Sequence, residues 1–257
     1  MILDFAWSEK ELRVGAVFQD YTVSFWDMMD KFSFEKCLQT TKYMDLLQTR
    51  VWYVDSGAWL TTDKSNGFYE WNIETETCIK WPVRHEGQII TLINLNRNRI
   101  TSSALDRCII IWDLTIRNSI SVLVLSDVSA HTMVYSSDFS LLLSAGFERT
   151  VLVWKLEGNR ECNLLNKLEG HTHTISALAA VKTTPIAITS DDAGFIKSWD
   201  LRTFKCLQTL NMDRMEINRI LAVPNLNTFI AVGNRLYWFE YSSMSNMNAN
   251  GVNVRYI

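Results

Sequence analysis

The sequence predicts an all-β protein built from six repeats of a four-stranded antiparallel sheet. A short strand that ends in tryptophan and an acidic residue, or in a close equivalent, recurs at nearly constant spacing. The intervening segments have strand length, are rich in β-branched and aromatic residues, and are bounded by Asn, Asp, Gly or Ser. No long segment has the periodicity of a helix, although the charged residues 28–47 would allow a short one.

The bulk composition excludes several classes of function. The chain has 257 residues, of which 47% are hydrophobic and 21% charged, which is enough for one large β domain. Its net charge of −3 lacks the basic surplus that a nucleic-acid-binding protein needs to neutralise phosphates. Apolar runs such as 121–126 and 141–146 are too short to span a membrane, and residues 1–14 lack the features of a signal peptide. We therefore expect a cytoplasmic protein without membrane insertion.

The cysteines follow the repeat and form no recognisable reactive pattern. Their number is odd and none forms a CxxC pair, so we expect free thiols in a reducing compartment and neither a disulfide framework nor a zinc site. The five are Cys37, Cys78, Cys108, Cys162 and Cys206. Four of them, all except Cys108, fall in the expected outermost strand of a unit, which favours packing over chemistry.

The repeat is defined by the strand ends. They are Trp26-Asp27, Trp71-Asn72, Trp112-Asp113, Trp154-Lys155, Trp199-Asp200 and Phe239-Glu240. From 26 to 71, 112, 154, 199 and 239, the steps are 45, 41, 42, 45 and 40 residues. A chance Trp-Asp pair is common, but six aligned units indicate an internal repeat.

Within each unit we expect three or four strands. The third unit is the clearest, with strands at 88–95, 99–104, 108–114 and 120–125. The fifth unit repeats the pattern at 174–181, 185–190, 195–201 and 205–210. The repeats fill residues 1–241. Residues 242–257 form a Ser/Asn/Met-rich tail that reads as a flexible linker, in which "VNVRYI" would supply a terminal strand.

A four-stranded sheet cannot bury both of its faces by itself. Sheets stacked radially, each against the next, bury those faces and leave only short edges, which is the β-propeller architecture. The sequence predicts either a six-bladed ring or an incomplete seven-bladed one. An open ring would present strand edges that require a covering partner or further sequence.

These residues resemble the WD-repeat family over about residues 2–241, and most closely over 88–241. In that family, a tetrad of His, Ser or Thr, Asp and Trp ties the strands of one blade together. The resemblance assigns the third-blade tetrad to His85, Ser102, Asp106 and Trp112. It assigns the fifth to His171, Thr189, Asp192 and Trp199, with Asp191 as the alternative acid.

The other blades depart from the pattern. In the fourth, Glu148 replaces the Asp, and His131 lies about two residues off register. The first, second and sixth units lack the His. We expect the three units without the His to be weaker blades.

A Ser, a His and an Asp in one group also resemble a catalytic triad. However, no nucleophile-elbow sequence surrounds the Ser, and the set recurs with the blade period, which indicates a structural role. The Asp191-Asp192 pair fits a polar hairpin turn. The histidines form no metal-binding pair, and no Gly-rich phosphate loop occurs. We therefore predict no enzymatic activity, no metal site and no cofactor.

The leading functional hypothesis is a protein–protein interaction scaffold in a multi-subunit assembly. Residues 168–210 and 234–241 are similar to large WD-repeat proteins of cilia and flagella, some of which carry EF-hands. That resemblance implies a part in an axonemal or cytoskeletal assembly, although this sequence has no EF-hand loop. The alternative is a substrate receptor of a cullin–RING ubiquitin ligase. Such receptors carry Trp-Asp-x-Arg at a strand end, as residues 199–202 do, and Arg202 would be the contact residue.

Overall fold

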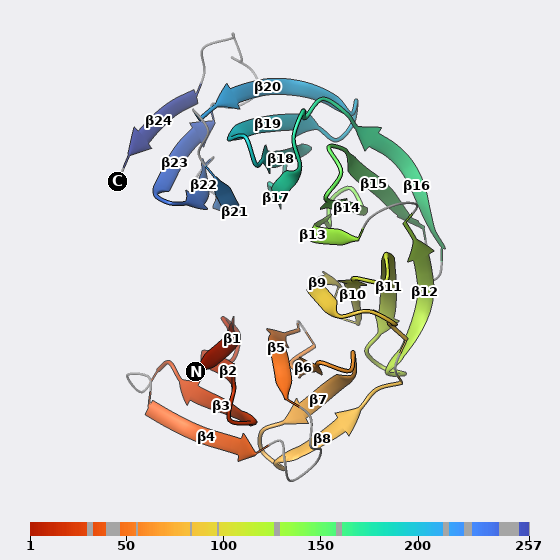
Figure 1. Ribbon diagram of the computed structural model, residues 1–257, viewed down its shortest axis with the longest axis vertical. Coiled ribbons are helices and arrows are strands. Elements are labelled where there is room, and N and C mark those ends of the chain that lie inside the picture. Colours follow the sequence, from red (N-terminus) through yellow and green to blue (C-terminus); the bar gives the residue numbers. More distant parts are fainter. Residues whose placement is uncertain are drawn as a thin grey trace. The chain divides into compact units, whose positions relative to one another are not determined.

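The computed structural model contains only strands as regular elements among the residues it describes. Those residues are 1–257 without 30–32, 40–46, 55, 83, 97, 126–128, 158–160, 213–215, 224–227, 242–251 and 257. Side chains are likewise left out at 33–39, 161, 240–241 and 252–256. The strands form six four-stranded antiparallel sheets (Figure 1). The predicted fold class is therefore confirmed.

The chain divides into two compact units, Met1–Val124 and Leu125–Ile257. The first unit contains three sheets, formed by β1 (Ile2–Ser8), β2 (Arg13–Phe18), β3 (Thr22–Asp27) and β4 (Ser33–Gln39); by β5 (Gln48–Tyr53), β6 (Trp59–Asp63), β7 (Phe68–Asn72) and β8 (Thr77–Lys80); and by β9 (Ile89–Asn96), β10 (Arg99–Ala104), β11 (Cys108–Asp113) and β12 (Asn118–Val124).

The second unit also contains three sheets. They are formed by β13 (Ala130–Ser136), β14 (Leu141–Gly146), β15 (Val151–Glu157) and β16 (Glu161–Leu168); by β17 (Ile175–Ala180), β18 (Ile186–Asp191), β19 (Phe195–Asp200) and β20 (Lys205–Asn211); and by β21 (Ile217–Val223), β22 (Thr228–Gly233), β23 (Leu236–Tyr241) and β24 (Val252–Tyr256).

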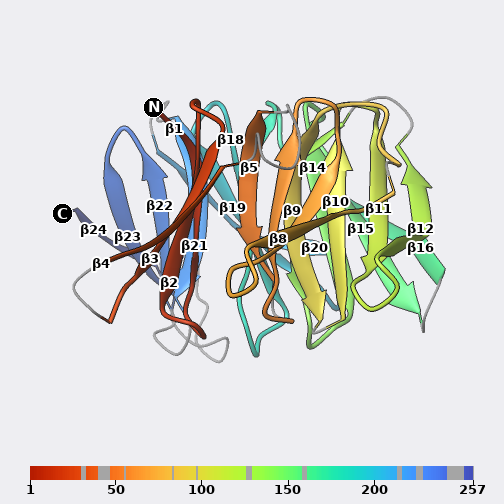
Figure 2. The same ribbon diagram turned by 90° about the horizontal axis from the view of Figure 1, so that it is seen from below.

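Each sheet is a meander in which consecutive strands pair with each other. Figure 2 shows neighbouring strands of a sheet joined by short turns. The pairing of the third strand with the fourth often shifts at the recurring aromatic residue, at Trp26, Trp112, Trp154 and Trp199. Such an irregularity adds local twist and turns the outer strand relative to the inner three.

Within each unit, the recurring aromatic residue packs on the sheet that precedes it in the chain. In the first unit, Trp71 belongs to a core cluster with Val17 and Phe25, and Trp112 to one with Leu60 and Phe68. The second unit repeats the arrangement, since its two clusters pair Trp199 with residues of β14 and β15, and Phe239 with residues of β18 and β19. The repeat is therefore one packing interaction used several times.

The first sheet also carries its recurring tryptophan, Trp26, on one of its faces. Trp26 pairs with Val14, and Val14 pairs with Trp7, so the three side chains share this face. None of them belongs to a core cluster of the described residues. Trp7 is 55% exposed, and Phe5 on the same strand is 68% exposed.

Most strand bounds agree with the sequence predictions. In the third and fifth units, every observed bound lies within two residues of the expected one. The suggestion of a short helix in 28–47 is wrong for 33–39, which form β4, while 30–32 and 40–46 lie outside the described residues. In the tail, 252–256 form β24, which pairs with β23, and the expected linker at 242–251 is not described.

No helix long and apolar enough to cross a bilayer occurs in the part of the chain that the structure describes. Whether the sheets close as six blades or belong to a seven-bladed ring stays a prediction.

Gly146, at the end of β14, lies where the backbone comes very close to that of Ser129. A Cβ built on Gly146 would lie 2.0 Å from the carbonyl oxygen of Ser129, which is backbone and cannot rotate away. We expect Gly146→Ala to lower the free energy of unfolding by about 1–3 kcal/mol, as overpacked sites do. Urea unfolding measures the loss. The control Ser137→Ala changes an exposed residue and should leave the midpoint in place. Equal midpoints for both variants would contradict the close approach.

Candidate functional site

The third sheet contains a continuous chain of buried polar groups. The Trp112 indole N–H donates to Ser102 Oγ at 2.7 Å, and Ser102 Oγ lies 2.7 Å from His85 Nε2. His85 Nδ1 lies 2.8 Å from Asp106 Oδ2. A carboxylate accepts only, so Nδ1 carries the ring proton and Nε2 accepts the Ser102 hydroxyl. The structure thus brings together the four residues predicted for this sheet.

The acid of this set also fixes the turn after β10. Asp106 accepts backbone N–H groups of Cys108 at 2.9 Å and of Glu86 at 2.8 Å. One carboxylate therefore joins the hairpin turn to the loop that carries His85. Loss of the carboxylate would leave three donors without their acceptor at once, and one of them is the buried His85 ring N–H.

The fifth sheet repeats this arrangement and corrects one prediction. Trp199 Nε1 donates to Thr189 Oγ1 at 2.9 Å, and Thr189 Oγ1 lies 2.5 Å from His171 Nε2. His171 Nδ1 lies 2.8 Å from Asp191 Oδ2, so the acid is Asp191 and not Asp192. Asp191 lies two residues after Thr189 on β18, and alternate residues of a strand share a face. Asp192 follows outside the strand and is exposed.

The second sheet holds a related network that the sequence prediction missed. Trp71 Nε1 donates to Thr61 Oγ1 at 2.7 Å, and the Thr61 hydroxyl donates to Gln48 Oε1 at 2.5 Å. An amide oxygen therefore replaces the imidazole. A detectable signal was present, because Thr61 precedes Trp71 by ten residues, as Ser102 precedes Trp112. Nothing in the spacing indicated Gln48, which lies on β5 and not in the preceding loop.

The fourth sheet retains only part of the set. Trp154 Nε1 donates to Ser144 Oγ at 2.8 Å. The ring of His131 instead packs edge-on against Phe147, with the centroids 4.0 Å apart, and its Nε2 is buried without a hydrogen-bond partner among the described residues. Burial lowers the pKa of His131.

In the two end sheets, the position of the hydroxyl is taken by alanine. The backbone registers place Ala16 in the first sheet and Ala231 in the sixth at the positions of Ser102 and Thr189. Both alanines are almost fully buried. In the sixth sheet, Phe239 stacks on Phe229 with the centroids 4.6 Å apart, so dispersion and apolar burial replace the hydrogen bond.

The buried histidines are closed to substrates. The side chains of His85 and His171 have 0% exposed surface. Burial lowers the pKa of each, although the neighbouring carboxylate opposes the shift. Burial also opposes ionisation of Asp106, but hydrogen bonds from Cys108, His85 and Glu86 outweigh it and lower its pKa. A neutral, sealed imidazole cannot exchange protons with a bound molecule, so these sets stabilise blades.

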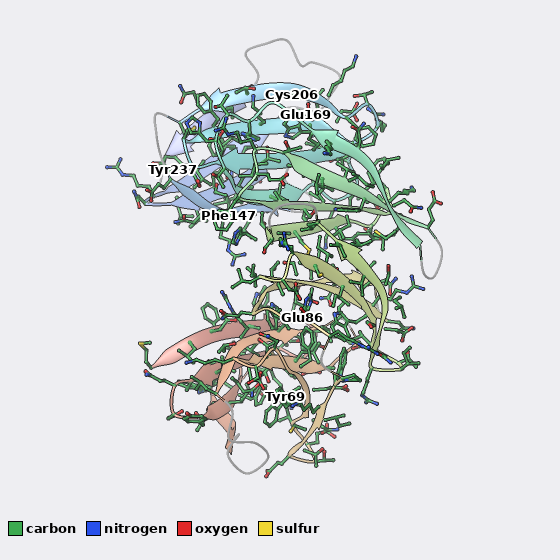
Figure 3. The ribbon with its side chains drawn as sticks, turned by 45° about the vertical axis from the view of Figure 1, so that its right-hand side comes forward. Tyr69, Glu86, Phe147, Glu169, Cys206 and Tyr237 are labelled. Carbon is green, nitrogen blue, oxygen red and sulfur yellow. The ribbon has the colours of Figure 1, made fainter. Side chains whose placement is uncertain are left out.

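The thiols also lack the features of reactive groups. Cys78, Cys108, Cys162 and Cys206 are free. Burial raises the pKa of Cys78 and Cys108, and that of Cys162 to about 11, which keeps these thiols protonated near neutral pH. Cys206 lies on the outer strand β20 and is exposed (Figure 3). No group of three or more His, Cys, Asp or Glu residues suited to a metal ion occurs within the described residues.

Arg202 lies in the turn after β19. Its backbone N–H and its Nε both donate to Asp200 Oδ1, at 3.0 and 3.2 Å, and Thr203 Oγ1 donates to the other carboxylate oxygen. The Arg202 side chain is still 58% exposed. Asp200, the acid of the Trp-Asp pair, therefore restrains Arg202 through its backbone N–H and its Nε, while the side chain stays accessible.

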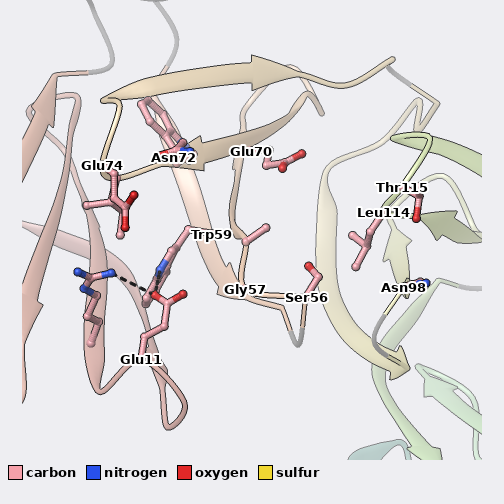
Figure 4. Close-up of a pocket in the computed structure, with 14 residues that line it drawn as sticks. Glu11, Ser56, Gly57, Trp59, Glu70, Asn72, Glu74, Asn98, Leu114 and Thr115 are labelled. Carbon is pink, nitrogen blue, oxygen red and sulfur yellow. Dashed lines mark hydrogen bonds and ion pairs between the residues drawn. The ribbon is translucent and has the colours of Figure 1, made fainter.

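Two glutamates join neighbouring sheets of the first unit. Glu11 accepts the Trp59 indole N–H at 3.1 Å and lies 3.6 Å from Arg13. Glu70 accepts two bonds from Arg117, at 2.6 and 3.2 Å, and one from the Trp81 indole at 3.1 Å. Both line one hollow of about 450 Å³ (Figure 4).

No family model matches the sequence. It is 29% identical over 159 residues to the CCR4-associated factor 4 homolog of Candida glabrata, which covers 56% of this chain and 27% of that protein. It is 27% identical over 142 residues to cilia- and flagella-associated protein 337 B of Tetrahymena thermophila, covering 54% of this chain and 11% of the relative. It is 30% identical over 108 residues to THO complex subunit 3 of Arabidopsis thaliana, covering 41% and 33%.

Among solved structures, a chain of the mitotic checkpoint complex superimposes with a TM-score of 0.79 over 98% of this chain and 75% of the other, at 18% identity. The chain is therefore similar to WD-repeat proteins in its repeat pattern and shares its fold with a solved chain. The fold likeness agrees with the hydrogen-bonded sets found at the blade spacing. This chain spans at most 33% of the length of the three relatives named above.

The two neighbouring acids of the fifth blade give a matched test. We expect Asp191→Asn to lower the free energy of unfolding by about 1–3 kcal/mol, because the charged acceptor of the buried His171 is lost. Asp192→Asn should change it by less than about 0.5 kcal/mol, as exposed substitutions do. Urea unfolding of both variants measures the difference. A larger loss for Asp192→Asn would overturn the assignment.

Stability should also depend on pH through the sealed histidines. Burial depresses the pKa of His85 and His171 in the folded state, so below about pH 6.5 the unfolded chain binds more protons than the folded one. The contribution of the two neutral histidines to the free energy of unfolding is complete above that pH. It is lost as the pH falls toward their pKa values in the folded state. We expect a steady urea midpoint from about pH 8 to 7 and a falling one below about 6.5.

His171→Gln supplies the control, because it removes one of the titrating groups. Its midpoint should start lower and fall less steeply with pH than that of the original chain. An unchanged slope would show that His171 is not held neutral in the fold.

Proposed function

We propose that this chain is a non-enzymatic interaction module in a multi-subunit assembly. One observation carries the proposal: the His–Asp sets that resemble a catalytic triad are buried inside blades, whereas large apolar side chains are exposed. His85 and His171 have no exposed side-chain surface. Phe5 and Trp7 are 68% and 55% exposed. Exposed aromatic residues on a rigid frame are typical anchors for protein partners.

The assembly that we propose is ciliary or cytoskeletal. Its support is the similarity to the cilia- and flagella-associated protein of Tetrahymena thermophila, together with the family resemblance of 168–210. To test it, the tagged chain is expressed in a ciliated cell and the axonemes are extracted with detergent. We expect the chain to remain with the axoneme, whereas complete release into the soluble fraction would contradict the ciliary assignment.

A second candidate is a substrate receptor for a cullin–RING ligase, and the geometry of Arg202 favours it. The Arg202 side chain is exposed, and the hydrogen bond from its Nε to Asp200 restrains it, so less entropy is lost when a partner binds it.

We expect Arg202→Ala to weaken binding of the purified ligase adaptor at least tenfold, as loss of an arginine hot spot does, in a binding titration. Arg149→Ala, another exposed arginine of the second unit, is the control. Equal affinities would remove this candidate.

A further inference from the structure

The first unit carries an exposed aromatic patch beside two adjoining hollows. Phe5 and Trp7 form the patch and lie on β1. Trp7 also lines a hollow of about 910 Å³ together with Tyr53 and Asn94. The hollow of about 450 Å³ shares Ser56 and Asn98 with it, so the two are continuous. A tryptophan thus borders a polar depression long enough to receive more than one side chain.

The lining of the two hollows is unevenly charged. Its carboxylates are Glu9, Glu11, Glu70 and Glu74, and its cations are Lys10 and Arg13. Arg117 lies outside the lining but binds Glu70, so four negative groups face three positive ones and leave an excess of one negative charge. A concave surface with low-dielectric walls strengthens the field of such an excess.

The carboxylates differ in whether a cationic side chain of this protein already pairs with them. Arg13 accompanies Glu11, and Arg117 binds Glu70 through two bonds, so both acids are already balanced. Glu74 is exposed, and no hydrogen bond or ion pair is found for it among the described residues. Figure 4 shows Glu74 and Glu11 on the same side of the hollow. Among the three acids of the smaller hollow, Glu74 is therefore the one available to a cation from outside.

The shape and chemistry of the lining select an organic cation over a metal ion. The described carboxylates form no group close enough to coordinate a metal. The rest of the lining offers amides and hydroxyls, at Asn72, Asn98, Ser56 and Thr115, which suit a peptide backbone. The neighbouring Trp7 offers an apolar surface.

We propose that this surface binds a basic peptide segment of a partner protein. A lysine or arginine side chain enters the smaller hollow and pairs with Glu74, and a nearby apolar residue of the segment packs on Trp7. The inference rests on the proposed interaction function and names the chemistry of the partner. Electrostatic complementarity sets the specificity, and the aromatic contact supplies apolar burial.

The test uses short fluorescent peptides in which leucine alternates with arginine, glutamine or glutamate. Fluorescence anisotropy with the whole chain measures their affinities. We expect the arginine peptide to bind at least about tenfold more tightly than the glutamine peptide, and the glutamate peptide not to bind. Glu74→Gln and Trp7→Ala should each weaken the arginine peptide by about tenfold.

Two matched controls separate this site from general attraction. Glu157→Gln removes an exposed carboxylate, and Phe147→Ala an exposed aromatic ring, both in the second unit. Neither should change the affinity. Equal binding of the arginine and glutamine peptides, or equal losses in the test and control variants, would overturn the proposal. If the chain remains with its assembly but binds no basic peptide, this inference alone fails; if it has no stable partner, the interaction function fails.

Discussion

The structure depends on one interaction, the burial of an aromatic ring from the third strand of a sheet against the preceding sheet of the same unit, which occurs in the second, third, fifth and sixth sheets. An indole is large enough to fill the space between two sheets, but its N–H then needs an acceptor. In four of the six sheets, a hydroxyl ten residues earlier on the second strand supplies it. In the second, third and fifth sheets, a further polar side chain bonds to that hydroxyl in turn.

This dependence explains which features the sequence reveals. The tryptophans and the strand alternation are local patterns, so the fold class could be predicted from their spacing. The sets of His85 and His171 could be assigned because those residues match the tetrad that the resemblance to WD-repeat proteins implies. The acid of the fifth blade could not, because Asp191 and Asp192 are adjacent and only the pairing register decides which one faces the imidazole. Gln48 was missed for a related reason, since an amide from β5 replaces a ring expected from the preceding loop.

The same packing separates stability from recognition. The imidazole, hydroxyl and carboxylate groups of the His85 and His171 sets are buried inside the blades, where they hydrogen-bond to one another. The groups left on the surface are aromatic rings, balanced glutamates and loop amides, which suit reversible contact with another protein. In the first unit, Glu11 and Glu70 belong to both sets, because each joins two sheets and also lines the hollow. A partner bound in the hollow would therefore contact residues that also hold these sheets together.

The alanines of the two end sheets have a mechanical consequence. Because Ala16 and Ala231 carry no hydroxyl, β2 and β3, and likewise β22 and β23, lack the hydroxyl-to-indole bond that joins these strands in the four interior sheets. The interior sheets have an additional cross-link that must break before their strands separate. A force pulling on the two termini would therefore peel the flanking hairpins away first, and the segments from β5 to β20 would be the last to yield.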